Sequence, residues 1–381
     1  MPVSPRYLLV ALFLAFSVAT ADSTPGRVEV VRTPDGGIQP QAVVDAKGTM
    51  HLIYYKGDPG HGDLFYVRRE SGQSDFSSPI RVNSQPGTAI AKGTIRGGQV
   101  ALGRGGVVHV VWNGSTPTYK DPAPMSYSRL KTGATAFEPQ RNLMKATTAL
   151  DGGGTVAADD AGRVYVAWHG RGLGDPEGEV HRKLWVARSV DDGATFATER
   201  PAFAQATGAC ACCGTKALVD AKGTAYVLYR AATNGTERDL FLLSSRDGGD
   251  HFTGRSVHPW KINACPMSSA SLADSSTGPV AAWETAGQVY FSHVAATQDP
   301  IAAPGRSGDR KHPAVAVAPD GSTLLAWTEG TGWQKGGSLA WQLFDASGRP
   351  TEIKGRVDRG IPVWSLPTVI TRPDGGFTIV R

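Results

Sequence analysis

One short hydrophobic pattern recurs along the chain: a turn glycine, then a mostly apolar strand that ends on an aromatic residue. Gly223-Thr-Ala-Tyr-Val-Leu-Tyr229 is the clearest copy. Further copies end at Tyr54, Trp112, Trp168, Trp283 and Trp327, and a last one runs from Gly375 to Arg381. Successive endings are 44 residues (283 to 327) to 61 residues (168 to 229) apart. Seven copies near one period indicate a repeat protein.

Each repeat has room for four strands. In the fourth unit they are expected at 216–220, 224–229, 239–245 and 254–258. Four antiparallel strands in roughly 40–60 residues are typical of a β-propeller blade, so the sequence predicts an all-β propeller. Six units are complete and the seventh, 366–381, has only two strands. Residues 27–32 are therefore expected to supply an outer strand and close seven blades, with six blades as the alternative if the terminal pieces merge.

The first residues have the pattern of a secretory signal. Arg6 precedes an apolar run from 7 to 18, and Ala19-Thr-Ala21 fits a cleavage site. We expect a signal peptide at 1–21, a single propeller domain at 22–381, and a secreted or periplasmic protein. No later stretch reaches the roughly 20 apolar residues of a membrane span.

The net charge of the chain indicates which kinds of ligand it favours. The formal net charge is +5 and the pI is about 9.0. This excess favours an acidic glycan or another small anionic ligand. Because no block of Lys and Arg stands out, nucleic-acid binding is not expected.

A second motif follows the third strand of two repeats. Residues 189–196 and 245–252 both fit S-x-D-x-G-x-x-F, and weaker copies occupy 71–76 and 128–137. The Asp is expected to accept backbone hydrogen bonds, the Gly to adopt positive φ, and the aromatic to plug the gap to the next blade. This motif and the four-strand period resemble the Asp-box (BNR-repeat) propellers of the sialidase superfamily. The resemblance implies glycoside hydrolysis, such as exo-α-sialidase activity on acidic sugars, at the face opposite these turns.

Polar and aromatic residues gather on that opposite face, in the loops between second and third strands and in the crossovers between blades. Because loops carry binding and catalysis more often than strands do, a ligand site is expected there. The face holds these residues: His61, His169, His181, His258, His312, Trp260, Trp333, Trp364, Arg96, Arg230, Arg310 and Arg359.

All four cysteines are expected together at one mouth of the channel. Cys210, Cys212 and Cys213 precede the fourth inner strand, and Cys265 precedes the fifth. An even number in an exported protein favours disulfides, with Cys265 paired to one of the other three, since a vicinal bridge is strained. A thiolate site for copper(I) or zinc, helped by Met267, is the alternative, and free thiols are the third reading. No cofactor is expected under the disulfide reading.

The resemblance also implies site residues. Sialidases hold the sugar carboxylate with three arginines, for which Arg96, Arg310 and Arg230 are candidates. Asp121 stands where the acid/base would lie, and Glu284 where a glutamate activates the nucleophile. Trp260 is a further substrate-binding candidate.

The nucleophile position departs from the family pattern. Where a Tyr-Ser-x-Leu-like segment is expected, the chain has Val363-Trp364-Ser365-Leu366. Tryptophan has no hydroxyl with which to attack an anomeric carbon. Three function classes remain: a glycoside hydrolase or lyase, a non-catalytic carbohydrate- or protein-binding propeller, and a metal- or redox-linked exported propeller.

Overall fold

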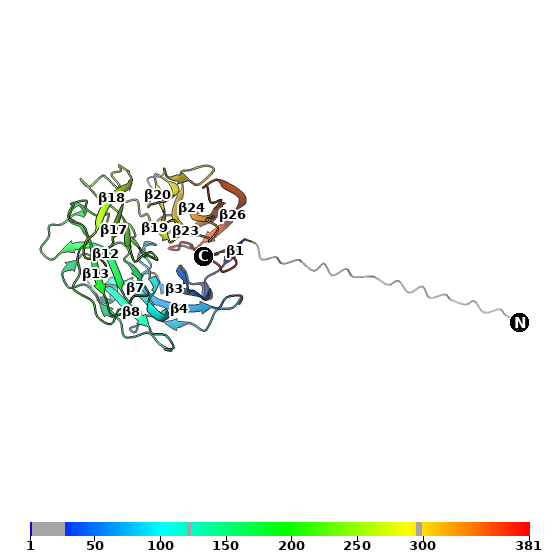
Figure 1. Cartoon of the computed structure of the whole chain (residues 1–381), viewed down its shortest axis with the longest axis horizontal. Helices are drawn as coiled ribbons and strands as arrows, with labels where there is room; N and C mark the ends of the chain where they lie inside the picture. Colours follow the sequence, from blue (N-terminus) through cyan, green and yellow to red (C-terminus); the bar gives the residue numbers. More distant parts are fainter. Residues whose placement is uncertain (2–26, 120–122, 295–298) are drawn as a thin grey trace.

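Seven β-sheets surround a central axis and form a seven-bladed propeller (Figure 1). The structure, a computed structural model, describes Met1 and residues 27–119, 123–294 and 299–381. In these ranges the longest helix, α1 (Thr116–Tyr119), has four residues. The predicted all-β propeller and its seven blades are confirmed. Apart from Met1, the expected signal segment lies outside the described residues.

The strands of the first six blades follow one another outward from the channel. Blades one to three contain β2 (Ile38–Val44), β3 (Met50–Asp58), β4 (His61–Arg69), β5 (Ile80–Arg81); β6 (Gln99–Leu102), β7 (Val108–Asn113), β8 (Met125–Leu130), β9 (Arg141–Asn142); β11 (Thr155–Ala158), β12 (Val164–Gly172), β13 (Lys183–Ser189) and β14 (Arg200–Pro201), with β10 (Thr147–Thr148) added beside β12. Blades four to six contain β15 (Lys216–Val219), β16 (Ala225–Arg230), β17 (Leu240–Ser245), β18 (Thr253–His258); β19 (Ala270–Ala273), β20 (Val280–Thr285), β21 (Gln288–His293), β22 (Ile301–Ala302); β23 (Arg310–Val317), β24 (Thr323–Glu329), β25 (Gly337–Phe344) and β26 (Pro350–Ile361).

The two ends of the chain build the seventh blade together. β27 (Thr368–Thr371) pairs antiparallel with β28 (Phe377–Val380), and β1 (Val28–Val31) pairs parallel with β28. The expected N-terminal outer strand is therefore present. The last blade differs from the four-stranded antiparallel pattern, because it has three strands and one parallel pair. Glu29 of β1 also forms a salt bridge with Arg69 of the first blade, with 3.0 Å between Glu29 Oε2 and Arg69 Nη2.

The repeated aromatic residues fill the spaces between blades. Trp112, Trp168 and Trp283 are at most 1% exposed. They pack in clusters drawn from adjacent sheets, such as the one that joins the second and third blades around Trp168. The second strands run past these aromatics rather than ending at them, as far as Asp58 in β3 and Gly172 in β12. Each sheet thus buries both faces against its neighbours.

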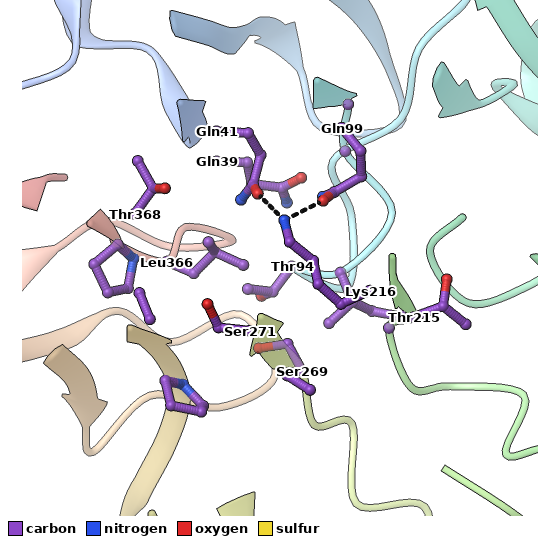
Figure 2. A pocket seen from close by; sticks show the side chains of 18 residues that line it. Gln39, Gln41, Thr94, Gln99, Thr215, Lys216, Ser269, Ser271, Leu366 and Thr368 are labelled. Atoms are coloured by element: carbon purple, nitrogen blue, oxygen red, sulfur yellow. Dashed lines mark hydrogen bonds between the residues drawn. The ribbon is translucent and has the colours of Figure 1, made fainter. Parts of the chain in front are cut away.

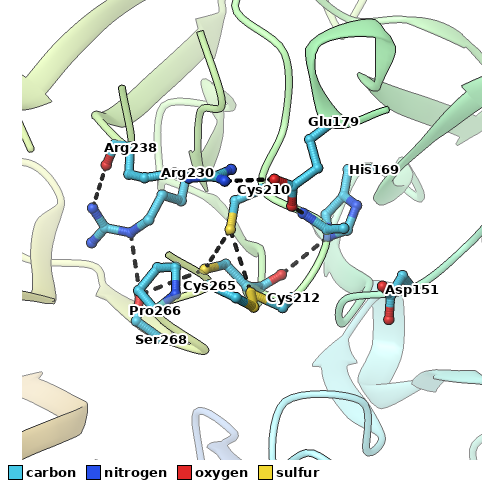
Figure 3. The surroundings of a disulfide bond; sticks show 12 residues. Asp151, His169, Glu179, Cys210, Cys212, Arg230, Arg238, Cys265, Pro266 and Ser268 are labelled. Atoms are coloured by element: carbon cyan, nitrogen blue, oxygen red, sulfur yellow. Dashed lines mark hydrogen bonds and ion pairs between the residues drawn. A yellow bond between two sulfur atoms is a disulfide. The ribbon is translucent and has the colours of Figure 1, made fainter. Parts of the chain in front are cut away.

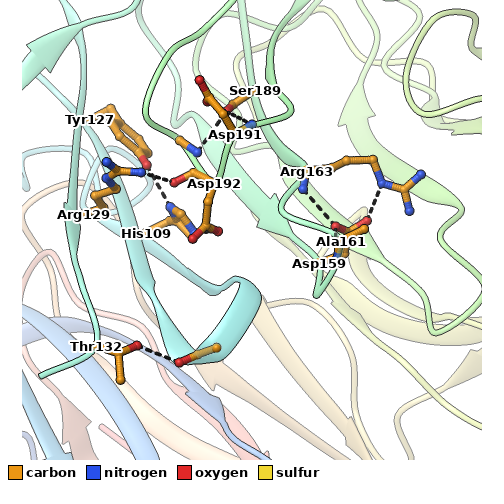
Figure 4. Close-up of polar contacts among 12 residues, drawn as sticks. His109, Tyr127, Arg129, Thr132, Asp159, Ala161, Arg163, Ser189, Asp191 and Asp192 are labelled. Carbon is orange, nitrogen blue, oxygen red and sulfur yellow. Dashed lines mark hydrogen bonds and ion pairs between the residues drawn. The ribbon is translucent and has the colours of Figure 1, made fainter.

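The S-x-D-x-G-x-x-F turns have the expected internal bonds (Figure 4). Asp191 Oδ1 accepts the Ser189 hydroxyl at 2.7 Å and the Thr195 N–H at 2.8 Å. Gly193 has φ 73°, a left-handed conformation that suits glycine. Phe196 stands edge-on to Tyr127 at 4.8 Å between ring centroids, so the aromatic fills the gap to the preceding blade, not the following one.

We predict that ring closure depends on the β1–β28 hydrogen bonds. Arg27 and Val31 carbonyls accept from Phe377 and Arg381 N–H at 2.8 and 3.0 Å, so alternate β1 residues face β28. Val31→Pro removes an N–H that faces β28, whereas Val30→Pro removes an N–H that points away from β28. An edge strand can lose the second kind of N–H without losing a hydrogen bond of the sheet. Val31→Pro is expected to lower the free energy of unfolding by about 1–3 kcal/mol more than Val30→Pro, measured by urea denaturation.

Val30, unlike Val31, packs in the cluster between the sixth and seventh blades, so Val30→Ala and Val31→Ala are the references for the packing lost at each position. If Val31→Pro destabilised the protein no more than Val31→Ala does, this ladder would not hold the ring closed.

Candidate functional site

The crossovers and the loops between second and third strands lie at the end of the propeller opposite the Asp turns. We call this end the upper face. A cavity of about 50 Å³ lies in the central channel beneath this face, and a pocket of about 940 Å³ opens on the face over the sixth blade.

A lysine occupies the central channel. Lys216, the first residue of β15, extends across the axis, and its Nζ donates to Gln41 Oε1 at 2.9 Å and Gln99 Oε1 at 2.8 Å (Figure 2). Burial lowers the pKa of Lys216 to about 8. Sequence reasoning missed this residue, although a signal exists: all three polar residues directly precede an apolar triplet of an inner strand. The lysine links the first, second and fourth blades.

The pocket over the sixth blade is basic, with five basic and two acidic side chains in its lining. Arg306, Lys335 and Arg359 are exposed and make no side-chain hydrogen bond or salt bridge with the described residues. Glu329 is already engaged by Arg356 and, at 3.4 Å, by Arg310. Burial works to raise the Glu329 pKa, but hydrogen bonds from Trp327 and Arg356 lower it overall. The pocket therefore offers free cations to an anionic ligand.

Arg310 lies in the wall of this pocket, but its donors point into the protein. Nη1 donates to Gln288 Oε1 at 3.0 Å and to the Ala303 carbonyl at 2.9 Å, and Nη2 donates to the Pro304 carbonyl at 2.8 Å. Its guanidinium also lies 5.0 Å from the Trp327 ring centroid. Arg310 mainly shapes the pocket.

Arg96 is likewise held by protein groups. It pairs with the Asp151 carboxylate, and its Nε and Nη1 donate to the Asp151 and Lys92 carbonyls, each at 2.8 Å. A β-carbon added at Gly93 would meet Arg96 and lie 3.8 Å from the Trp333 ring, so that ring reaches the second-blade crossover. Asp121, the expected acid/base, lies outside the described residues.

Arg230, Trp260 and Glu284 come together at the fourth and fifth blades. Arg230 donates to the carbonyls of Arg238 and Glu284 at 2.5 Å each, and lies 4.9 Å from the Trp260 centroid. Glu284 is 2% exposed, and burial raises its pKa. Both charged residues are buried, and no hydrogen bond or salt bridge among the described residues links Arg96, Arg230 and Arg310 to a common partner.

The upper-face histidines divide into exposed and buried groups. His61 and His181 are exposed, whereas His169 and His312 are at most 5% exposed. His169 Nε2 lies 3.1 Å from the Cys213 carbonyl, and burial lowers its pKa to about 4. His258 accepts the Trp283 indole N–H at 2.7 Å. These buried rings serve packing and local hydrogen bonds.

The four cysteines lie together: Cys212 is bonded to Cys265, and Cys210 Sγ lies 3.6 Å from Cys212 Sγ and 3.1 Å from Cys213 Sγ. Figure 3 shows Cys210, Cys212 and Cys265 side by side. Cys212 and Cys265 form a disulfide with Cα atoms 6.3 Å apart, which confirms the expected pairing of Cys265 with one of the trio. Cys210 and Cys213 are buried free thiols whose Sγ atoms are 3.1 Å apart. Met267, next to Pro266, is half-buried.

Structural comparison shows which known proteins share this architecture. A Hadza microbial sialidase is 12% identical over 81% of this chain and 68% of its own, with a TM-score of 0.51. A GH93 α-L-arabinofuranosidase of Fusarium graminearum complexed with arabinobiose is 11% identical over 87% and 96%, also at 0.51. A leech intramolecular trans-sialidase is 9% identical over 86% and 78%, at 0.50. No family model and no curated protein matches the sequence.

The chain shares its β-propeller fold with these proteins. At these identities the likeness shows the fold alone, so the site is derived from the residues of this chain. No helix in the described part of the chain is long and apolar enough to cross a membrane.

The position that the sequence resemblance assigns to the nucleophile holds a packed indole. Trp364 is 6% exposed, and its ring stands edge-on to Trp333 at 4.7 Å between centroids. Its backbone is left-handed, with φ 64°, and its carbonyl accepts Gln39 Nε2 at 2.7 Å. Trp333 is 53% exposed, so the open aromatic surface here belongs to Trp333, with the Trp364 ring buried against it.

We predict that Lys216 makes stability depend on pH above neutrality. Its pKa is about 8 when folded, against an ordinary lysine value of 10.5 in the unfolded chain, so the unfolded chain binds more protons between these values, and stability rises with pH there. From pH 7.5 to 9.5, wild type should gain about 1–2 kcal/mol relative to Lys216→Met in urea unfolding.

Lys222→Met, at an exposed lysine, is the control and should follow wild type. Parallel pH profiles for wild type and Lys216→Met would contradict a buried, desolvated ammonium.

Proposed function

We propose that this protein is an exported propeller that binds acidic glycans in the pocket over the sixth blade and does not hydrolyse them by the retaining sialidase route. One observation carries the proposal: a pocket of about 940 Å³ on the upper face, whose exposed Arg306, Lys335 and Arg359 have no salt bridge to a carboxylate among the described residues. Unpaired guanidinium and ammonium groups suit a sugar carboxylate.

The volume of the pocket favours a carbohydrate over a smaller anion as its ligand. The pocket has room for more than one sugar ring, within the range of small-molecule sites. Lys335 lies on the β24–β25 loop that also carries the exposed Trp333, so charge and an aromatic surface are two residues apart. Arg310 supports the wall from below, because its donors are bound to protein groups.

Three tyrosines that pack between the sheets are poorly placed to act as the nucleophile of retaining hydrolysis. A tyrosine nucleophile must lose its proton and reach the anomeric carbon. Tyr54, Tyr66 and Tyr229 are at most 3% exposed, and burial raises the pKa of each to about 12. Trp364 cannot replace them, since an indole forms no glycosyl ester or ether intermediate. Recognition without turnover is the function that these side chains support best.

Binding is predicted to depend on the pocket cations. Arg306→Ala and Lys335→Ala should each weaken binding of sialyllactose by roughly tenfold, or about 1.4 kcal/mol, measured by calorimetry. Binding should weaken further as salt rises from 0.05 to 0.5 M, because salt screens exposed charges.

Arg349→Ala is the matched control, because Arg349 is 79% exposed in a turn on the opposite face. Neutral lactose should bind no better to wild type than to the variants. Wild-type affinity in both pocket variants would rule out this site. A second titration with oligogalacturonate in place of sialyllactose shows whether the pocket recognises any sugar carboxylate or sialic acid in particular.

Hydrolysis of a fluorogenic sialoside by the purified protein is predicted to stay at the rate of the buffer blank. Trp364→Ala serves as the companion variant and should also be inactive, since no hydroxyl is removed. Turnover that is lost on changing a tyrosine to phenylalanine, with retention shown by NMR of the product, would overturn the non-hydrolytic assignment.

A further inference from the structure

The cysteines form one continuous cluster of sulfur atoms. Cys210 Sγ lies 3.1 Å from Cys213 Sγ and 3.6 Å from Cys212 Sγ, and these three sulfurs all lie within 4.8 Å of one another. Cys212 is bonded to Cys265, which is exposed, while Cys210 and Cys213 are buried. A solvent-accessible disulfide therefore covers a buried pair of thiols.

A buried arginine beside this cluster lacks partners for two of its nitrogens. Arg238 is 5% exposed and its Nη2 binds Glu179 Oε2 at 2.6 Å, but its Nε and Nη1 have no hydrogen-bond partner among the described residues. Figure 3 shows its guanidinium next to the Cys210 side chain. Leaving such donors unsatisfied in the interior is costly, so the site is built for negative charge beside Cys210.

A second arginine lies behind Cys213. Arg230 Nε donates to Ser268 Oγ at 3.2 Å, and that hydroxyl lies 3.9 Å from Cys213 Sγ. Two buried guanidinium groups thus flank the thiols from the fourth blade. Neutral thiols do not need this compensation, whereas a set of thiolates holding a cation does.

The spacing of the sulfurs fits a three-coordinate metal ion. With metal–sulfur bonds of about 2.3 Å, as in zinc thiolates, three ligands around one ion stand about 4 Å apart. The observed 3.1 and 3.6 Å separations require shifts of less than about 1 Å. All three ligands come from a single four-residue loop, 210–213, so they can adjust together.

The donor set favours copper(I) over zinc. Structural zinc takes four tetrahedral ligands, from thiolates alone or with histidine, so it would also need the sulfur of Cys265, which is exposed and lies on a different crossover. Among the described residues, no histidine nitrogen or carboxylate oxygen joins this group of three sulfurs. His169 Nε2 is directed to the Cys213 carbonyl. An all-thiolate trio selects a soft monovalent ion.

We propose that Cys210, Cys212 and Cys213 bind one Cu(I) ion, and that the Cys212–Cys265 disulfide closes this site until it is reduced. Opening is a two-electron step: a dithiol donates two electrons and two protons, the S–S bond breaks to give two thiols, and the dithiol becomes a disulfide. Cu(I) then replaces the thiol protons, which pass to solvent. The site is independent of the glycan pocket.

The test is a competition titration of the purified chain with Cu(I) against a chromophoric Cu(I) chelator under anaerobic conditions. Wild type reduced with a dithiol, which is then removed, should bind one Cu(I) per chain at least about tenfold more tightly than unreduced wild type. Cys265→Ser, purified anaerobically, leaves Cys212 unpaired and should bind one Cu(I) without reduction. X-ray absorption should show three sulfur neighbours.

The double variant Cys212→Ser/Cys265→Ser is the matched control, because it also removes the disulfide but leaves only the thiols of Cys210 and Cys213, so it should not gain affinity on reduction. Thermal unfolding of each variant checks that it is folded. Equal affinity in this double variant and in Cys265→Ser would overturn the proposal. So would a reduced site that binds Zn(II) with the same stoichiometry and resists displacement by Cu(I).

Discussion

Every sheet in this molecule has two apolar faces, and only a closed ring lets all of them be buried. The aromatic residues at the second strands fill the gaps between neighbours, and the Asp turns extend this packing, as Phe196 does against Tyr127. Closure is completed by β1, which joins the two ends of the chain in one sheet. The inter-blade contacts and the geometry of both faces depend on that pairing.

Closure brings separate crossovers to one end of the ring, and the fold uses many charged side chains there as internal braces. Arg96, Arg230 and Arg310 donate to carbonyls or carboxylates of their own surroundings. A guanidinium suits this task because its planar fork can serve several acceptors at once. What remains free for a ligand is a different set of cations, carried by the outer loops of the sixth blade.

The sulfur cluster has a structural as well as a chemical consequence. The Cys212–Cys265 disulfide joins the crossovers before the fourth and fifth blades. Reducing it would free that connection without changing the sheets themselves, since their strands are held by hydrogen bonds and core packing. The loops of the upper face can therefore respond to redox conditions while the ring stays closed.

Local pattern alone determined the strands, the propeller architecture, the turn chemistry and the nearness of the cysteines, and it favoured seven blades over six. These features repeat with a fixed period, and each depends on a few adjacent residues, so the period and the turn chemistry could be recognised directly. The N-terminal closing strand also followed, because the last repeat lacked its outer part. Only the tertiary structure decided which cysteine pairs with Cys265, and that Lys216 reaches across the channel to Gln41 and Gln99. It also decided that the candidate arginines bind protein groups, whereas the side chains of Arg306 and Lys335 have no hydrogen-bond or salt-bridge partner among the described residues. Those outcomes depend on which side chains from distant blades reach one another once the ring closes, and no spacing along the chain encodes such distances.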